Sequence, residues 1–248
     1  MVIKYDFSNK ARATSTDYLA DLIKKTGAKR ILEVGGGANP TFPLTFVKQH
    51  GLEYTVLDIS ADELGKAPGD YVKVCADITS KQLDLPGRYD LIFSKMLAEH
   101  VEDGETFHRN VYRLLSANGR AFHFFPTLFA PPFVLNRLLP EQWAEKLVNI
   151  LQSGREREGR YAKFPAYYSW CRGPVPSQIK RFEALGYRVS EYIGFFGHDG
   201  YYTKLPAVLK IHQMFSGWLV RHPVPFLCSF AFVLLQKDEC DQARICNV

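Results

Sequence analysis

The stretch KRILEVGGGANP, residues 29–40, decides the fold of this 248-residue chain. Three apolar residues surround a single acid, Glu33, and three glycines follow directly. A short apolar run that ends in glycines is typical of a buried strand that turns sharply. Because glycine carries no side chain, such a turn leaves room for a ligand to approach the backbone. The residues on either side of the turn narrow the choice of ligand.

Strands and helices alternate on both sides of this stretch. Strands are predicted at 31–34, 54–58, 70–75, 89–94 and 120–125, and helices at 15–28, 42–50 and 104–119. This alternation over residues 1–125 predicts a doubly wound α/β fold, in which helices cover both faces of a parallel sheet. Ligands of such sheets bind beyond the carboxyl ends of the strands, which is where the glycines lie.

The second half of the chain has a different composition. Residues 126–175 are rich in proline and aromatic residues and show no strand pattern, so we expect a substrate-binding insert after the fifth strand. A helix at 177–186, a strand at 187–197, a helix at 205–219 and a buried strand at 225–235 are predicted to follow. No segment has the composition of a flexible linker, and residues 1–248 are therefore expected to form a single domain.

The overall composition is that of an ordinary soluble globular protein, with 46% hydrophobic and 23% charged residues. The net charge of +5 permits an anionic substrate or membrane surface without requiring either. The five cysteines lack CxxC spacing, which favours free thiols and indicates no metal site. The N-terminus is too polar for a signal peptide, and 225–235 is too short for a transmembrane segment. We expect a cytoplasmic protein, with peripheral membrane association as a further option.

The three glycines do not form a dinucleotide-binding fingerprint. That fingerprint, GxGxxG, needs a third glycine where this chain has Pro40, and proline has no N–H to offer a pyrophosphate. An NAD-dependent reductase is therefore disfavoured, although it remains an alternative. Glu33, Gly35 and Gly37 instead match the pattern acid-x-Gly-x-Gly, in which the acid can receive an ammonium group.

Two further acids follow the next two predicted strands. Asp58 ends the strand 54–58, where its carboxylate can accept hydrogen bonds from both hydroxyls of a ribose. Asp77 and Ile78 follow the strand 70–75, where a carboxylate can meet an adenine amine and an apolar side chain can pack on the ring. An ammonium group, a ribose and an adenine together describe S-adenosylmethionine (SAM).

With these motifs in this order, the chain resembles the class I SAM-dependent methyltransferases of the type 11/type 12 group. The resemblance rests on ILEVGGGAN (31–39), YTVLDIS (54–60), VCADIT (74–79), YDLIFSKMLAEHV (89–101) and LLSANGRAFHFF (114–125). It implies a Rossmann-like methyltransferase fold whose seven-stranded sheet is mostly parallel, with an antiparallel last strand. It also implies SAM as cofactor, S-adenosylhomocysteine as product, and cofactor contacts from Glu33, Gly35, Gly36, Gly37, Asn39, Asp58, Ile59, Asp77, Ile78 and Ser94. Asn39 departs from the glycine found there in many members.

Histidines are the candidates for a catalytic base. Methyl transfer from a sulfonium needs alignment and, for a hydroxyl acceptor, a base. His198 is attractive because Asp199 beside it can orient the imidazole, although GHDGYY can equally be a polar turn. His100 belongs to AEHV, which resembles an EH pair that in the family more often shapes the cofactor pocket. His123 lies in the middle of a strand and is expected in the core.

The segment RYAKFPAYYSWCRGP, residues 160–174, concentrates aromatic and basic residues. Tyr167, Tyr168, Trp170 and Arg172 are therefore the expected substrate-binding residues, because aromatic faces and cations suit a sugar, an aromatic ring or a phosphate. A proline-braced lid that only packs on the sheet would explain the same residues equally well.

The leading hypothesis is an enzyme that O-methylates a small-molecule or glycan acceptor. Lipid-linked glycans are included because KFPAYYSWCRGP is loosely similar to bacterial methyltransferases associated with surface polysaccharide or lipid-linked glycans. RNA methylation is an alternative suggested by the basic, aromatic insert. Nucleic acid is disfavoured, however, because FSKMLAEHV stands where base methyltransferases often carry an NPPY-like or cysteine-based signature. A non-catalytic SAM-binding scaffold protein is the alternative from another class, and the retained acids argue against it.

Overall fold

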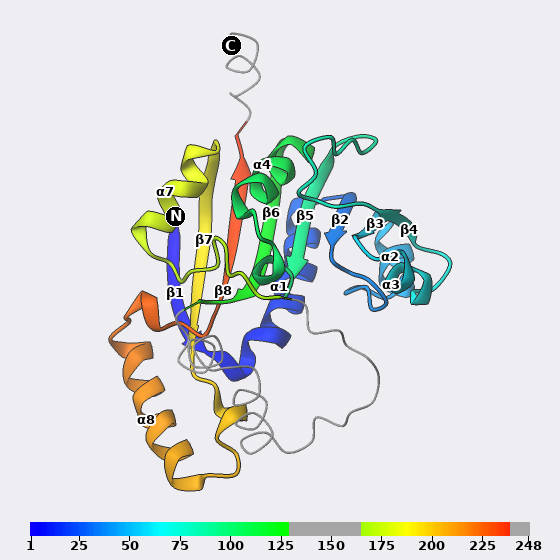
Figure 1. Ribbon diagram of the computed structural model, residues 1–248. Coiled ribbons are helices and arrows are strands. Elements are labelled where there is room, and N and C mark those ends of the chain that lie inside the picture. The colour runs from blue at the N-terminus through cyan, green and yellow to red at the C-terminus, as the bar shows by residue number, and fades with distance from the viewer. Residues whose placement is uncertain (129–164, 239–248) are drawn as a thin grey trace.

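A computed structural model describes residues 1–128 and 165–238 of the chain. Its strands form one eight-stranded sheet in the order β1-β7-β8-β6-β5-β2-β3-β4 (Figure 1). All neighbouring strands run parallel except β8, which is antiparallel to both β6 and β7. This arrangement confirms the predicted doubly wound, mostly parallel sheet with an antiparallel last strand.

The bounds of the elements agree with most of the predicted segments. The strands are β1 (Val2–Phe7), β2 (Arg30–Val34), β3 (Glu53–Asp58), β4 (Val72–Cys75), β5 (Tyr89–Lys95), β6 (Leu115–Pro126), β7 (Tyr187–Phe196) and β8 (Phe230–Lys237). The helices are α1 (Ala11–Thr26), α2 (Leu44–His50), α3 (Ala61–Lys66), α4 (Gly104–Leu114), α7 (Pro176–Ala184) and α8 (Pro206–Arg221). Short 3-10 turns are η1 (Ser8–Lys10), η2 (Ala98–His100), η3 (Asp199–Tyr201) and η4 (Pro225–Leu227).

The sheet has eight strands instead of the seven predicted, because β1 carried no recognisable strand signal. Its sequence, VIKYDF, has no continuous apolar run, and most of its residues are exposed at the edge of the sheet. β1 pairs in parallel with β7. Glu191 of β7 holds it there, forming an ion pair with Lys4 at 2.7 Å and accepting a hydrogen bond from the Tyr18 hydroxyl of α1 at 2.6 Å.

Several predicted boundaries were wrong; α1, for example, begins at Ala11 instead of residue 15, and β6 begins at Leu115 instead of residue 120. The helix predicted over 104–119 ends at Leu114, because the chain pairs with the sheet from the next residue, Leu115, which lies opposite Tyr89. Lys237 donates hydrogen bonds to the carbonyl oxygens of Tyr112 and Leu115, at 3.0 and 3.1 Å, and so ties down the end of the helix. The strand predicted over 225–235 begins only at Phe230, since the prolines before it favour the 3-10 turn η4.

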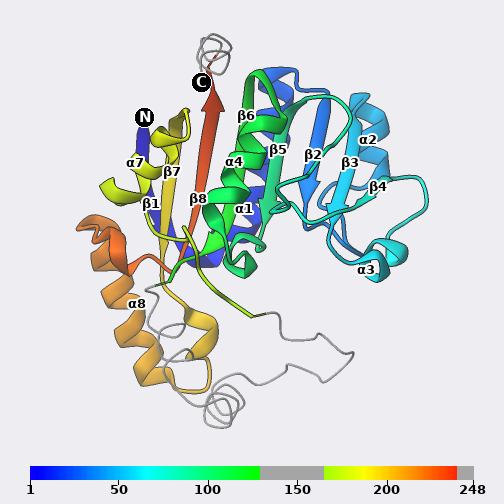
Figure 2. The same cartoon turned by 45° about the horizontal axis from the view of Figure 1, so that its top comes forward.

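Helices cover both faces of the sheet. One hydrophobic core includes Phe107 of α4 and Phe182 of α7, and the other includes Leu19 of α1 and Leu64 of α3. Figures 1 and 2 show α4 and α1 on opposite sides of β6. Burial on both faces explains why the central strands are continuously apolar and could be recognised from the sequence.

The predicted insert, 126–175, falls between the end of β6 and the start of α7, and its residues 129–164 lie outside the described part of the chain. Its returning end is anchored to the sheet edge, where the Leu128 amide donates to the Cys171 carbonyl at 3.0 Å. Among the described helices, none combines the length and the apolarity needed to cross a bilayer.

Candidate active site

The glycine turn after β2 is packed so closely that side chains cannot replace its hydrogens. Gly35 has a φ of 79°, and a Cβ atom there would lie 2.6 Å from Cδ1 of Leu97. A Cβ atom at Gly36 would lie 2.7 Å from Cγ1 of Val56. Gly37 has a φ of 44°, a left-handed conformation that favours glycine. The turn therefore brings bare backbone to the carboxyl edge of the sheet.

Glu33, at the end of β2, is held in one orientation beneath this turn. Its carboxylate accepts hydrogen bonds from the Thr41 amide at 3.0 and 3.1 Å, the Thr41 hydroxyl at 2.6 Å and the Tyr54 hydroxyl at 2.5 Å. The side chain is only 3% exposed. Burial raises the pKa of Glu33 above its usual value, although the hydrogen bonds from Thr41 and Tyr54 lower it in part. A nearby cation would therefore stabilise the ionised form.

A cavity of about 320 Å³ opens beside Glu33. Its lining residues are Glu33, Gly35, Asn39, Thr41, Lys95, Met96 and Phe124. Lys95 is the last residue of β5 and donates a hydrogen bond to the Thr16 hydroxyl of α1 at 2.5 Å. Its positive charge lowers the pKa of Glu33. Met96 adopts a φ of 55°, a strained conformation for a residue other than glycine. The cavity is thus lined by both a carboxyl group and an ammonium group.

Asp58 lies at the end of β3, directly beside the glycine turn. Its Oδ1 atom accepts a hydrogen bond from the Ser60 amide at 2.9 Å. Its Oδ2 atom lies 3.2 Å from the position that a Cβ atom would take at Gly37. Ile59, the next residue, has a 65% exposed side chain. The structure therefore brings the expected ribose-binding acid and the expected methionine-binding glycines together.

Asp77 and Ile78 follow β4 at the same edge, but their side chains have different surroundings. Asp77 is exposed, and its Oδ1 atom accepts hydrogen bonds from the amide and hydroxyl of Thr79 at 2.8 and 2.7 Å. Ile78 is buried in the core on the α4 side, and its carbonyl oxygen accepts a hydrogen bond from Asn110 at 2.8 Å. Asp77 is accessible to a ligand, while Ile78 supports the chain from beneath.

Ser94 lies in the core and not on the cavity, contrary to expectation. Its hydroxyl is 2.8 Å from Nδ1 of His123, and both side chains are fully buried. Burial lowers the pKa of His123 to about 3, which keeps the imidazole neutral in its predicted core position. The next two residues, Lys95 and Met96, line the cavity instead.

His100 lies on the turn that packs over the glycines. The turn η2 begins after Leu97, whose side chain blocks the space beside Gly35. Nδ1 of His100 is 2.9 Å from the Pro165 carbonyl oxygen, so this nitrogen must carry the proton of the neutral ring. Nε2 lies 3.8 Å from Oε1 of the buried Glu99. In the neutral ring with its proton on Nδ1, Nε2 is the nitrogen that can accept a proton.

His198 and Asp199 do not form the orienting pair predicted from the sequence. The Asp199 carboxylate faces α8, where it lies 3.7 Å from Nε2 of His212 and accepts a hydrogen bond from Gln213 at 2.9 Å. Burial lowers the pKa of His198 to about 3, too low for an effective base near neutral pH. Three strands separate β7, which leads to His198, from β2. At the usual strand spacing, the two strands lie about 19 Å apart.

The predicted substrate-binding residues divide into two groups. Trp170 stacks on His108 of α4, with ring centroids 5.4 Å apart, and Arg181 of α7 lies over its ring. Arg172 donates hydrogen bonds to the carbonyl oxygens of Tyr168 and Cys171, at 2.8 and 3.1 Å. These contacts make Trp170 and Arg172 part of the local packing, as the lid interpretation expected.

Tyr167 and Tyr168 belong to a segment that is attached to the turn η2. Their amides both donate to the Glu99 carbonyl oxygen, at 2.8 and 3.0 Å, so this segment is attached to the turn that carries His100. Tyr168 packs partly against the core, whereas the Tyr167 side chain is 41% exposed. Of the four residues, Tyr167 is therefore the one most available to an acceptor.

Sequence reasoning missed Lys95 and Thr41. Lys95 could have been found, because it is the polar residue that ends an apolar strand at the carboxyl edge, as Asp58 does. Thr41 carried no such signal, since it reaches Glu33 only through the conformation of the loop after the glycines. Within the described residues, no group of three histidines, cysteines or acids lies close enough to hold a metal ion.

Comparison with known protein families gives a match in the first half of the chain. A family described as "Methyltransferase domain" matches residues 32–121, which extend from β2 into β6 and include the glycine turn and Asp58. No curated protein matches the chain.

Solved structures share its fold at low sequence identity. The N-methyltransferase NodS from Bradyrhizobium japonicum WM9, in complex with S-adenosylhomocysteine, is 12% identical, with 91% of this chain and 85% of NodS covered and a TM-score of 0.51. A SAM-dependent methyltransferase from Mesorhizobium loti is 18% identical, with 90% and 100% covered and a TM-score of 0.51. Phosphoethanolamine N-methyltransferase 2 from Haemonchus contortus is 14% identical, with 89% and 52% covered and a TM-score of 0.55. The domain match over residues 32–121 and the solved structures together show that this chain has the fold of SAM-dependent methyltransferases.

Proposed function

We propose that the carboxyl edge of β2, β3 and β4 binds SAM in a fixed orientation. The observation that carries this proposal is a cavity lined by both Glu33 and Lys95, directly beside a turn that only glycines can form. The amino acid part of SAM has one ammonium and one carboxylate group, so Glu33 and Lys95 complement both charges. In this proposal Asp58 binds the ribose hydroxyls and Asp77 binds the adenine amine.

We further propose that the methyl acceptor is a hydroxyl group of a small molecule or glycan, with lipid-linked glycans included. Bound SAM supplies an electrophilic methyl group on a sulfonium. A hydroxyl must lose its proton as it attacks, and in this proposal Nε2 of His100 takes that proton. His100 is a better candidate than His198, because burial lowers the pKa of His198 to about 3.

The acceptor would enter from the side of Tyr167. This residue is exposed and lies on the segment that hydrogen-bonds to Glu99, next to His100. We propose that the insert between β6 and α7 belongs to the same single domain and forms the acceptor side of the site. Trp170 and Arg172 would support this segment and not contact the acceptor themselves.

A nitrogen acceptor is the second candidate. Two of the similar structures are N-methyltransferases, and that of the Haemonchus contortus enzyme contains phosphomonomethylethanolamine. An amine attacks from its neutral form and needs a weaker base than a hydroxyl does. His100 would then matter less for the rate than it does for a hydroxyl acceptor.

Isothermal titration with S-adenosylhomocysteine tests the cofactor site. We expect binding by the wild type, a loss of roughly 30- to 100-fold in Asp58→Ala because charge-assisted hydrogen bonds are lost, and no change in Asp70→Ala. Asp70 is a matched control, since it is an exposed acid on the same half of the sheet. Absence of wild-type binding, or equal binding by Asp58→Ala, would refute the site.

Transfer of a labelled methyl group to panels of hydroxyl and amine acceptors then tests the acceptor class. For a hydroxyl acceptor we expect His100→Gln to lower kcat by about 10²- to 10⁴-fold. An unchanged kcat in His100→Gln with an amine acceptor would favour nitrogen methylation.

A further inference from the structure

Helix α8 carries two apolar faces, and within the described part of the chain only one of them packs on other residues. Ser216 and Leu219 are buried, and Leu219 belongs to a small core with Phe196 and Cys228. On the other side of the helix lies what we call the α8 stripe, made of Val208, Ile211, Met214, Phe215 and Trp218, all of which are exposed. Figures 1 and 2 show α8 extending beyond the carboxyl end of β7, away from the rest of the sheet.

The spacing of the α8 stripe makes it one continuous surface. Ile211, Met214, Phe215 and Trp218 lie at positions i, i+3, i+4 and i+7, which share one face of a helix. The rings of Phe215 and Trp218 stack at 6.1 Å between centroids. Ile211 and Met214 are each 69% exposed. Contiguous apolar residues of this size on a surface indicate a contact with something else.

The two charged residues of α8 itself, Lys210 and Arg221, are both positive. Lys210 lies one turn before Met214 and Arg221 lies one turn after Trp218, so both flank the stripe along one side. The sequence contains no Asp or Glu from Lys204 to Lys237. Asp199, the acid just before this segment, contacts His212 and Gln213 away from the stripe.

We propose that the α8 stripe binds the surface of an anionic lipid bilayer, with the helix lying in the plane of the interface. Helices that lie in this way combine an apolar face that contains Trp or Phe with flanking Lys and Arg residues, which contact the acidic headgroups. A second copy of the chain fits this surface less well. In a twofold dimer through the stripe, Lys210 and Arg221 of one copy would approach those of the other without any compensating acid.

Binding to such a surface would place the carboxyl edge of the sheet near the membrane, because α8 follows β7 at that edge. The enzyme could then reach an acceptor that is anchored in lipid. The docking surface itself does not depend on the proposed acceptor: vesicle binding without methyl transfer would support this inference alone.

Co-sedimentation of the full chain with vesicles tests the proposal. Vesicles of phosphatidylcholine with about 30% phosphatidylserine should bind the wild type, and pure phosphatidylcholine vesicles should bind it far more weakly. Ile211→Glu should abolish binding. Val72→Glu is the matched control, because Val72 is 60% exposed on the opposite edge strand, β4.

A charge variant keeps the test valid even if Ile211→Glu impairs folding. Lys210→Gln combined with Arg221→Gln should weaken binding to the anionic vesicles by roughly thirtyfold, since each basic residue contributes about fivefold. Lys24→Gln combined with Lys25→Gln, on exposed positions of α1, should leave binding unchanged. No wild-type binding at physiological ionic strength, equal losses in the two charge variants, or a dimer in solution that Ile211→Glu dissociates would each overturn the proposal.

Discussion

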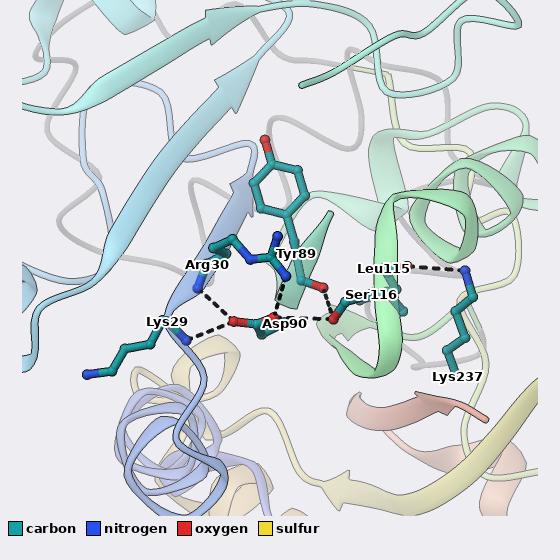
Figure 3. A network of polar contacts seen from close by, with 7 residues as sticks. All are labelled: Lys29, Arg30, Tyr89, Asp90, Leu115, Ser116 and Lys237. Carbon is teal, nitrogen blue, oxygen red and sulfur yellow. Dashed lines mark hydrogen bonds and ion pairs between the residues drawn. The ribbon is translucent and has the colours of Figure 1, made fainter. Parts of the chain in front are cut away.

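The two ends of the parallel sheet each hold a carboxylate, and the two are stabilised in opposite ways. At the amino ends of the strands, Asp90 accepts hydrogen bonds from the amides of Lys29 and Arg30, both at 3.0 Å, and from the Arg30 guanidinium at 3.2 Å (Figure 3). Ser116 donates to it as well, at 3.2 Å. Partial burial raises the pKa of Asp90, but these bonds and the Arg30 charge outweigh it, so the pKa is lowered.

Glu33, at the carboxyl ends, has the opposite balance. Burial is its largest effect and raises the pKa, although Thr41, Tyr54 and Lys95 lower it in part. Asp90 is therefore an acid whose charge stabilises the fold, while Glu33 is an acid whose charge is stabilised fully only by a bound cation. We propose that the amino ends of the strands serve the stability of the fold and that the carboxyl ends bind the ligand. The predictions below test this difference.

The largest effect is expected from filling the glycine turn. Gly36→Val should abolish binding of S-adenosylhomocysteine and lower the free energy of unfolding by about 3 kcal/mol or more, because its side chain would overlap Val56 and Glu33. Isothermal titration and urea denaturation measure the two quantities. Gly69→Val is the control, since no heavy atom lies within 4 Å of a Cβ atom at Gly69. Similar losses in both variants would contradict the packing of the turn.

Replacing each acid by its amide should separate binding from stability. Glu33→Gln should weaken S-adenosylhomocysteine binding by roughly 10- to 100-fold, because a charge-assisted bond is lost, and should change the free energy of unfolding by less than about 1 kcal/mol. Asp90→Asn should lower the free energy of unfolding by about 1 to 2 kcal/mol and leave binding unchanged. If the two variants have the same profile, the proposed difference between the edges is wrong.

The two acids should also respond to pH with opposite signs. The pKa of Asp90 is lowered from 3.8, so its stabilisation is present above that pH and is lost as the pH falls through the folded value. The pKa of Glu33 is raised from 4.5, so its contribution is present below that pH and is lost as the pH rises through the folded value. Glu33→Gln should therefore gain stability relative to the wild type as the pH rises toward neutral. Thermal unfolding of the wild type and both amide variants between about pH 2 and pH 7 measures this.

His198 lies at the carboxyl edge but outside the cavity, and its effect on stability is confined to acidic pH. Because burial lowers its pKa from 6.5 to about 3, His198 stabilises the fold fully above pH 6.5, and this stabilisation is lost as the pH falls from 6.5 toward 3. The wild type should lose up to about 1.4 kcal/mol per pH unit through this residue, and His198→Gln should lose correspondingly less. Parallel stability curves for the two proteins would show that His198 is not buried in its neutral form.

The central fold was predictable because its strands are buried on both faces. β2, β3 and β5 are short apolar runs, and helices with clear apolar periodicity cover them. The parallel sheet also places the residues that follow each strand at one edge, which is why Glu33 and Asp58 could be assigned to a common site. Ligand-facing residues at strand ends are therefore accessible to sequence reasoning.

The remaining features depend on side-chain directions that no local pattern records. Successive residues of a strand point to opposite faces, so a shift of one position separates the buried Ser94 from Lys95 on the cavity. The direction of Asp199 toward His212 depends on how α8 packs against β7, which is a tertiary contact. β1 escaped recognition because an exposed edge strand needs no apolar run.

The position of β1 has a practical consequence for any shortened version of the chain. A designer of shortened variants would readily remove this polar segment. Its removal would make β7 the edge of the sheet and leave the backbone groups of residues 191–196 that face β1 without their partner. β7 is an aromatic, largely buried strand, and an uncovered strand of this kind can pair with the same strand of another molecule. Removing the first seven residues should therefore produce aggregates.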